Sequence, residues 1–346
     1  MPIHLFRFCI ASILLLSVPA LPVQAATDAT PHRWTIEDVL GSDIKPFAIG
    51  HRGFGENLGG NPDKPIENTT ESVRRAFLEG AQIVEVDVVM TRDHIAVALH
   101  DDFLDDLTCV NQLSFSELHH HLKEASKLKH ILKVAHGFSV KRDHDDRPSG
   151  QVIMEIKTPA PLCDPDDSTV PALVAASLAA VNQTKMQDQV LIESFSPEIV
   201  AAVKTSQPAI PRILSFSLFQ ALTPEQIEAA TGLPVTLLDK NVGFGLQWVQ
   251  AGPFFRVPIY SSVFQYVGTL VTLQSRAASL DKDALQQLEY SSPGSGALLI
   301  QELHDIGIDS LVYTVNAQAE WLFLSSLGVD GFYTDDLAMG LSLEGQ

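Results

Sequence analysis

The chain has 346 residues, 45% of them hydrophobic, and its 42 acidic and 23 basic residues give a formal net charge of −19. A chain of this size and hydrophobic content can bury the large core of a single α/β domain. The negative charge argues against nucleic acid and anionic membranes as partners, but it allows an anionic substrate at a site that gathers its own positive charge.

Residues 1–25 have the features of a secretory signal peptide. A basic residue precedes an apolar run over residues 8–18, and residues 23–25 form a small-residue cleavage site. The apolar run is too short to span a bilayer. We therefore expect cleavage after Ala25, an exported product that is periplasmic or secreted, no membrane anchor, and an N-terminal segment over residues 26–45.

Beyond this segment, apolar β-branched stretches alternate with stretches of helical spacing. Strands are predicted at 47–53, 83–90, 95–99, 151–157, 189–195, 212–218, 311–316 and 329–335, with a short extended piece at 235–238. Helices are predicted at 68–80, 170–181, 197–205, 224–230, 296–306 and 321–327, and the stretch 113–150 is largely helical.

This alternation favours a closed (β/α)₈ TIM barrel over residues 46–340 rather than an open doubly wound sheet. We expect a small helical insertion after the third strand and a rim insertion around residues 241–276. No glycine-rich nucleotide-binding motif of the Rossmann or P-loop type occurs in the sequence.

Two carboxylates, Glu85 and Asp87, interrupt the apolar strand predicted at 83–90. Residues two apart on a strand point the same way, so both carboxylates leave one face while the intervening valines pack the other. Burying two like charges costs several kcal/mol per ion unless a cation offsets them. The pair predicts a metal site, and the alternative is an edge strand with a solvated polar face.

In a TIM barrel the reactive groups lie at the C-terminal ends of several strands. The first four predicted strands bring to that rim His51, Glu85, Asp87, His100, Glu155 and Lys157. Each has a structural alternative, such as a hydrogen-bonded rim histidine or a lysine that extends to solvent. Their joint occurrence favours a functional site.

Three carboxylates without a nearby cysteine suit Ca²⁺ or Mg²⁺ better than zinc. Arg52 and Lys157 flank them, and these cations together with a metal ion form a phosphate receptor. His51 and His100 would act as an acid–base pair, one taking a proton from an attacking hydroxyl and the other giving one to a departing alkoxide. The residues therefore predict phosphodiester cleavage.

Six ordered motifs resemble the glycerophosphodiester phosphodiesterase family: His51-Arg52-Gly53, Glu67-Asn68-Thr69, Glu85-x-Asp87, His100-Asp101, Glu155-x-Lys157 and the segment 328–335. The resemblance covers residues 47–336 and implies a TIM barrel. It further implies a divalent cation on the three carboxylates, catalytic His51 and His100, and phosphate binding by Arg52 and Lys157.

The reaction that this resemblance implies is hydrolysis of a glycerophosphodiester to sn-glycerol 3-phosphate and an alcohol such as choline or ethanolamine. The glycerol's own neighbouring hydroxyl would be the nucleophile, which exploits intramolecular attack. The chain departs from the family pattern in a longer loop over 53–67 and at Ile66, Tyr313 and Asp336. These departures bear on substrate preference, since none is a predicted ligand or histidine.

Two cysteines, Cys109 and Cys163, remain after the predicted signal peptide. An oxidising compartment favours a disulfide, and two free buried thiols are the alternative. Because both cysteines follow predicted barrel strands on the catalytic rim, we predict that they bond to each other and stiffen it.

Three other functions fit parts of this pattern. A phospholipase D-like enzyme for lysophospholipids would need an apolar groove, for which the aromatic candidates are Phe254, Phe255, Tyr260, Phe264 and Tyr266, although core packing also explains them. An exported barrel that binds without catalysis would have no need of buried charge. Metal-free phosphoinositide cleavage is disfavoured by the three carboxylates.

The histidines at 119–121 point in different directions on a helix and cannot all bind one ion.

Overall fold

The computed structural model describes residues 32–141, 147–240 and 244–346. The predicted signal peptide and the first part of the predicted N-terminal segment lie outside these residues. Among the helices described, none combines the length and the apolar character needed to cross a membrane.

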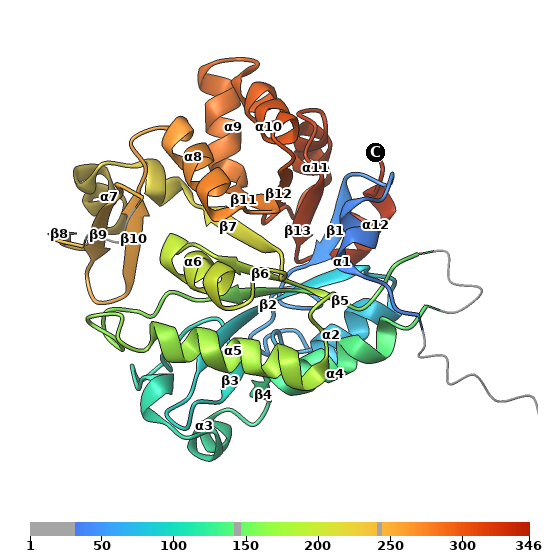
Figure 1. Ribbon diagram of the computed structural model, residues 1–346, viewed down its shortest axis with the longest axis vertical. Helices are drawn as coiled ribbons and strands as arrows, with labels where there is room; N and C mark the ends of the chain where they lie inside the picture. Colours follow the sequence, from blue (N-terminus) through green and yellow to red (C-terminus); the bar gives the residue numbers. More distant parts are fainter. Residues whose placement is uncertain (1–31, 142–146, 241–243) are drawn as a thin grey trace, which may run out of the picture. The chain divides into compact units, whose positions relative to one another are not determined.

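Within the described residues, eight parallel strands close into a barrel (Figure 1). They are β1 (Phe47–Gly50), β2 (Ile83–Met90), β5 (Gln151–Ile156), β6 (Val190–Ser194), β7 (Arg212–Phe216), β11 (Ala277–Asp281), β12 (Asp309–Tyr313) and β13 (Gly331–Thr334). Their order is β1-β13-β12-β11-β7-β6-β5-β2, and β2 pairs back to β1. The predicted (β/α)₈ barrel is confirmed.

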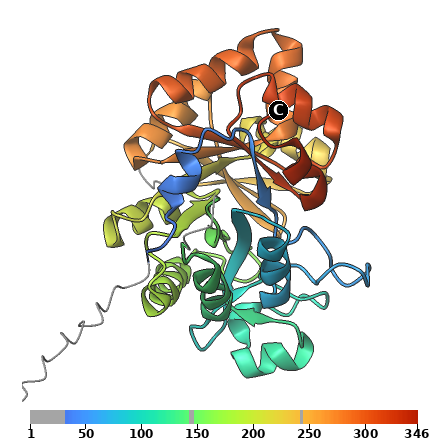
Figure 2. The ribbon, with the colours of Figure 1, turned by 90° about the vertical axis from the view of Figure 1, so that its right-hand side faces the viewer.

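Helices cover the outside of the barrel, and neighbours such as α2 with α4 and α4 with α5 contact one another (Figures 1 and 2). The covering helices are α2 (Thr70–Leu78), α4 (Leu128–Phe138), α5 (Val170–Thr184), α6 (Pro197–Ser206), α8 (Val263–Leu273), α9 (Lys282–Ser291), α10 (Ser295–Asp305), α11 (Gln318–Ser325) and α12 (Leu337–Leu343).

The period-2 pattern of the strands separates two buried layers. Alternate residues of β2, the valines 84, 86 and 88, face outward into the core between strands and helices. The inward positions Ile83, Ile153 and Leu191 fill the N-terminal half of the barrel. Helix α1 (Ile36–Leu40) packs its apolar side against this inner cluster. Residues that precede the barrel therefore help to close its N-terminal end.

The third predicted strand is not part of the barrel. β3 (Ala96–Ala98) runs antiparallel to β2 and pairs with β4 (Ser126–Lys127), so it forms a hairpin arm beside the barrel. The arm continues through a 3₁₀ turn (Val110–Gln112) and α3 (Phe115–His121). The prediction of a small helical insertion is therefore correct only for α3, because α4 buries its apolar side against the barrel core.

The second insertion begins earlier than predicted and has its own sheet. It contains a 3₁₀ turn (Leu218–Ala221), α7 (Pro224–Thr231), β8 (Val235–Leu238), β9 (Gln247–Ala251) and β10 (Phe255–Ile259). The three strands form an antiparallel sheet beside α7 (Figure 1). The predicted range 241–276 was wrong at its end, because α8 is a barrel helix.

One barrel strand was not predicted. β11 (Ala277–Asp281) consists mainly of alanine and serine, which are poor β formers. It pairs with β7 and β12 and is essential for closure. The extended piece at 235–238, by contrast, lies in the separate sheet as β8.

Candidate active site

A cavity of about 190 Å³ opens at the C-terminal ends of the barrel strands. It is lined by all seven predicted catalytic, metal and phosphate residues, His51, Arg52, Glu85, Asp87, His100, Glu155 and Lys157. The structure thus brings together groups from β2, β5, the loop after β1 and the hairpin arm. His100 reaches the cavity from the arm that follows β3, and not from a barrel strand as predicted.

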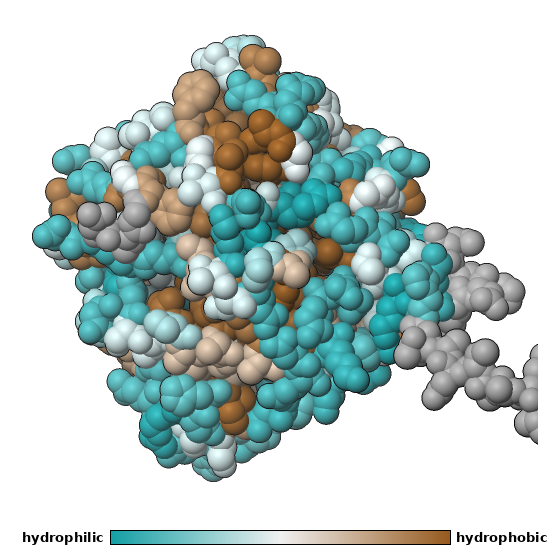
Figure 3. All heavy atoms as spheres, in the orientation of Figure 1, coloured by the Kyte–Doolittle hydropathy of each residue, from teal (hydrophilic) through white to brown (hydrophobic). Residues whose placement is uncertain are grey.

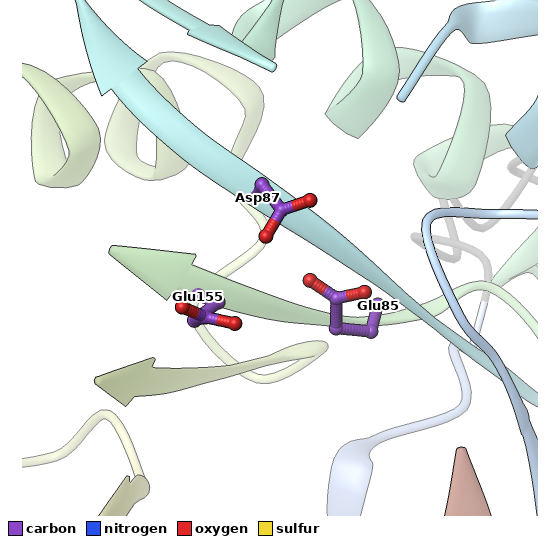
Figure 4. Close-up of side chains that lie close together, drawn as sticks. All are labelled: Glu85, Asp87 and Glu155. Carbon is purple, nitrogen blue, oxygen red and sulfur yellow. The ribbon is translucent and has the colours of Figure 1, made fainter. Parts of the chain in front are cut away.

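The three predicted metal ligands gather on two neighbouring strands (Figure 4). Glu85 and Asp87 come from β2, and Glu155 is the register partner of Asp87 on β5. One oxygen of each carboxylate lies within 4.8 Å of the others. Oε1 of Glu85 is buried and has no hydrogen-bond partner among the described residues. An oxygen-only donor set with an unsatisfied buried carboxylate oxygen fits a hard divalent cation.

The electrostatics of the carboxylates differ because their neighbours differ. Burial, together with the charges of Asp87 and Glu155, raises the pKa of Glu85 well above its ordinary value. Burial would also raise the pKa of Asp87, but Lys157, His100 and Arg52 outweigh it and lower that pKa. A bound cation would therefore relieve the unfavourable charge of Glu85.

A tight turn after β1 places Arg52 over the carboxylates. A Cβ on Gly50 would lie 2.1 Å from the carbonyl oxygen of Gly53, so only glycine allows this turn to close. Arg52 adopts a positive φ of 50°, and its backbone N–H donates to Oε2 of Glu85 at 2.9 Å. The guanidinium donates to Glu67 at 2.7 Å, which fixes its direction.

Lys157 follows β5 and lies inside the carboxylate cluster. Its Nζ is 2.9 Å from Oε1 of Glu155 and 3.2 Å from Oδ1 of Asp87. The predicted phosphate-binding side chain therefore contacts two predicted metal ligands in this structure. Asn68 completes the surroundings of Asp87 by donating to Oδ2 at 2.8 Å and accepting from its backbone N–H at 3.0 Å.

His51 is held by a carboxylate from the last barrel strand's loop. Its Nδ1 lies 2.8 Å from Oδ1 of Asp335, and the amide of Asn316 donates to Oδ2 of Asp335 at 2.7 Å. Burial raises the pKa of Asp335, but the bond from His51 and the backbone N–H of Glu56 lower it below its ordinary value overall. Nδ1 is thus engaged, and Nε2 remains for a substrate. Asp335 ends the motif segment 328–335, but the sequence does not predict it as a site residue.

His100 has the same arrangement in a more open position. Its Nδ1 lies 2.9 Å from Oδ1 of the next residue, Asp101, and 38% of the His100 side chain is exposed. The Asp101 bond fixes the ring, and no residue that the structure describes is hydrogen-bonded to its other nitrogen. The cavity therefore has one enclosed and one exposed histidine, each with a carboxylate at Nδ1.

Several lining residues were not predicted. Glu193 on β6 lies next to Glu155 in register, and its pKa is raised to about 7 by burial and by the Glu155 charge. Phe195, Tyr313 and Tyr333 supply the apolar part of the lining. The only sequence signal for Glu193 was its even spacing from the inward-facing Leu191.

The loops that carry these groups are joined at the rim. Cys109 and Cys163 form a disulfide, and the amide of Asn111 donates to the carbonyl of Cys163 at 2.9 Å. Asp102 accepts from the backbone N–H of Ala160 at 2.9 Å. These contacts connect the His100 arm to the loop after β5. Cys109 follows the hairpin strand β3, so the predicted placement after a barrel strand was wrong.

The aromatic residues considered for an apolar groove do not line the cavity. Tyr260 and Tyr266 are buried in the main core, Phe254 pairs with Phe103 at 5.8 Å, and Phe264 is exposed on α8. Among the described residues, the acidic triad is the only cluster with metal-binding geometry, and the histidines at 119–121 do not form one.

Comparisons with known proteins identify the family of the chain. Residues 51–232 match the model of the glycerophosphoryl diester phosphodiesterase family. A glycerophosphocholine phosphodiesterase of Candida albicans is 50% identical over 59 residues, which is 17% of this chain and 5% of that protein. The chain thus spans only a small part of that relative's length.

Solved structures share the fold at low sequence identity. A Silicibacter pomeroyi structure aligns with a TM-score of 0.61 and 19% identity, covering 89% of this chain and 96% of the other. An Oleispira antarctica phosphodiesterase in complex with the product sn-glycerol-3-phosphate aligns with a TM-score of 0.56 and 19% identity, covering 86% and 96%. Since the family model spans more than half of the chain, the protein belongs to the glycerophosphoryl diester phosphodiesterase family.

Proposed function

We propose that this protein hydrolyses glycerophosphodiesters to sn-glycerol 3-phosphate and an alcohol, with the help of a divalent cation. The observation that carries the proposal is one cavity that combines two carboxylate-supported histidines, three clustered carboxylates and two cationic side chains. Family membership and the product named for the Oleispira antarctica structure support the substrate class.

The histidines would move the protons. One removes the proton from the attacking glycerol hydroxyl while the other protonates the alkoxide as the P–O bond to the alcohol breaks. Attack by the neighbouring hydroxyl forms a cyclic phosphate, which water opens in a second step with the two histidine roles exchanged. Asp335 and Asp101 hold the rings so that the same nitrogen of each faces the substrate.

Glu85, Asp87 and Glu155 would hold the cation, which when bound supplies positive charge against the phosphate oxygens. Arg52 and Lys157 would add to that charge. Six to eight oxygen ligands suit Ca²⁺ and an octahedral set suits Mg²⁺, and both are compatible with three carboxylates plus water and substrate.

Release of glycerol 3-phosphate from glycerophosphocholine tests this function. We expect product with the purified chain, loss of product after EDTA, and recovery with Ca²⁺ or Mg²⁺. Turnover of lysophospholipids in place of glycerophosphodiesters would favour the phospholipase D-like alternative instead.

We further propose that the protein acts after export, in a periplasm or outside the cell. The support is the signal-peptide pattern of residues 1–25 and the disulfide, which persists in oxidising compartments. Fractionation of the producing cells and the N-terminal sequence of the mature chain test this, and an uncleaved cytosolic chain would contradict it.

A further inference from the structure

Glu193 is a fourth carboxylate in the cavity, and the proposed function assigns it no role. It lies on β6 as the register partner of Glu155, and only 3% of it is exposed. Besides Glu155, it contacts the neutral residues Ser215 and Tyr333, both buried. A charged group at this position is costly unless it serves something nearby.

Both oxygens of Glu193 accept hydrogen bonds from hydroxyl groups, one on the neighbouring strand β7 and one on β13 across the barrel. Ser215 on β7 donates to Oε1 at 2.7 Å, and Tyr333 on β13 donates to Oε2 at 2.7 Å. β7 and β13 are not neighbours in the barrel, since β11 and β12 lie between them. The two bonds therefore fix the carboxylate inside the barrel from different sides.

The charges that line the cavity do not balance. Among the described residues that line the cavity, the four carboxylates Glu85, Asp87, Glu155 and Glu193, when ionised, outnumber the two permanent cations Arg52 and Lys157. Arg52 also forms an ion pair with Glu67, so part of its positive charge is already compensated by a carboxylate outside this set. Oε1 of Glu85, which has no hydrogen-bond partner within the described part of the chain, points to the same deficit of positive charge.

We infer that Glu193 acts as an outer carboxylate of the cation site, strengthening the binding of a divalent cation to Glu85, Asp87 and Glu155 and weakening the binding of phosphate. This inference rests on the proposed function, because it presupposes a cation at those three residues. The ionised form of Glu193 acts with opposite sign on a cation and on an anion in the same cavity. The chain thereby holds its metal tightly at some loss of affinity for an anionic ligand.

The variant Glu193→Gln tests this inference, because glutamine has the same shape and hydrogen-bonds both hydroxyls without the charge. Ca²⁺ and Mg²⁺ are titrated by calorimetry into EDTA-treated protein that has been freed of chelator. We expect the cation Kd to rise by roughly tenfold or more. With Mg²⁺ saturating, we expect the Kd of sn-glycerol 3-phosphate to fall.

The matched control is Glu344→Gln. Glu344 is also a buried carboxylate, but it accepts from the backbone N–H of Ala48 and pairs with Arg147, away from the cavity lining. Its substitution should leave both Kd values unchanged. If Glu193→Gln does not fold, Glu193→Met repeats the comparison with an apolar side chain of similar volume.

The outcomes separate the two proposals. If the natural chain binds the cation and the folded Glu193 variant binds it with the same Kd, the role of Glu193 is overturned and the proposed function stays intact. A natural chain that binds neither Ca²⁺ nor Mg²⁺ would overturn the metal dependence of the proposed function, and with it this inference.

Discussion

His51 and His100 can serve as a proton-transfer pair because each has one ring nitrogen engaged by a carboxylate. Asp335 binds Nδ1 of His51, and Asp101 binds Nδ1 of His100. The free nitrogens therefore belong to the same ring position in both residues. This shared arrangement suits two steps in which the acid and the base exchange roles.

His51→Ala and His100→Ala should each lower kcat by on the order of 10²–10⁴ without unfolding the protein. Both side chains are only partly buried, at 16% and 38% exposure, so their loss leaves no large cavity. Glycerol 3-phosphate release and thermal unfolding are measured for each variant. His120→Ala, on the exposed face of α3, is the control. Full activity in either active-site variant would exclude that histidine from catalysis.

Asp335→Asn should change both activity and the acid response of stability. Because the folded-state pKa of Asp335 is lowered, its ionised form stabilises the fold above its unfolded pKa of about 3.9. That contribution is lost as the pH falls from about 4 toward the lower folded pKa. The natural chain should therefore exceed the variant in stability most at neutral pH, with the difference shrinking below about pH 4.

Urea unfolding of both proteins at pH 7 and pH 3 measures this difference. In parallel, kcat of Asp335→Asn should fall by on the order of 10²–10⁴, because His51 loses the group that orients it. A stability difference that is the same at both pH values would show that the Asp335 charge does not favour the folded state.

The sequence indicated Glu85, Asp87, Glu155 and Lys157 through a local rule, whereas His100 reaches the same cavity from the hairpin arm, which that rule does not cover. Alternate residues of a parallel strand share one face, and barrel geometry brings strand ends to one rim. The supporting residues follow no such rule. Asp335 is 284 residues from His51, and Glu193 meets Tyr333 across 140 residues, so only the closed barrel reveals these pairs.

At the scale of elements, the arm that carries His100 lies outside the barrel, and covalent and hydrogen bonds to neighbouring loops hold its position. The disulfide from Cys109 to Cys163 and the bond from Ala160 to Asp102 tie it to the loop after β5. The insertion between β7 and α8 reaches the same loop, since Leu162 donates to the carbonyl of Pro253 at 2.8 Å. The rim is therefore one connected layer.

The double variant Cys109→Ser, Cys163→Ser should lower the free energy of unfolding by about 2–4 kcal/mol, because the disulfide constrains a loop of 54 residues in the unfolded chain. It should also lower kcat, since His100 lies on the released arm. Denaturant unfolding and product release are compared with the natural chain in oxidised and reduced form. Identical unfolding curves in all forms would show that the disulfide carries no stability.

Element type was predictable where periodicity is strong, but pairing was not. The apolar stretch 95–99 fits a strand of a parallel barrel as well as a strand of an antiparallel hairpin. Nothing in its local sequence shows that β3 runs antiparallel to β2. β11 escaped prediction for the opposite reason, because its inward positions Ala277 and Ser279 are small residues with weak β preference. The segment is a strand because its backbone pairs with β7 on one side and β12 on the other, which closes the barrel.

At the scale of the molecule, the negative net charge and the positively charged groups of the site are compatible. The face shown in Figure 3 is mainly hydrophilic, with scattered apolar groups. The chain's charge of −19 repels an anionic substrate at long range. Arg52, Lys157 and a bound cation would act at short range inside the cavity, where screening by salt is weak.

Removal and return of the metal ion shows whether catalysis by this cavity depends on a divalent cation. The purified mature chain is treated with EDTA, dialysed, and assayed for glycerol 3-phosphate release from glycerophosphocholine with no ion, with Ca²⁺ and with Mg²⁺. We expect no product without an ion and restored turnover with at least one of them. Full turnover in the chelated protein, or no product with either ion, would contradict it.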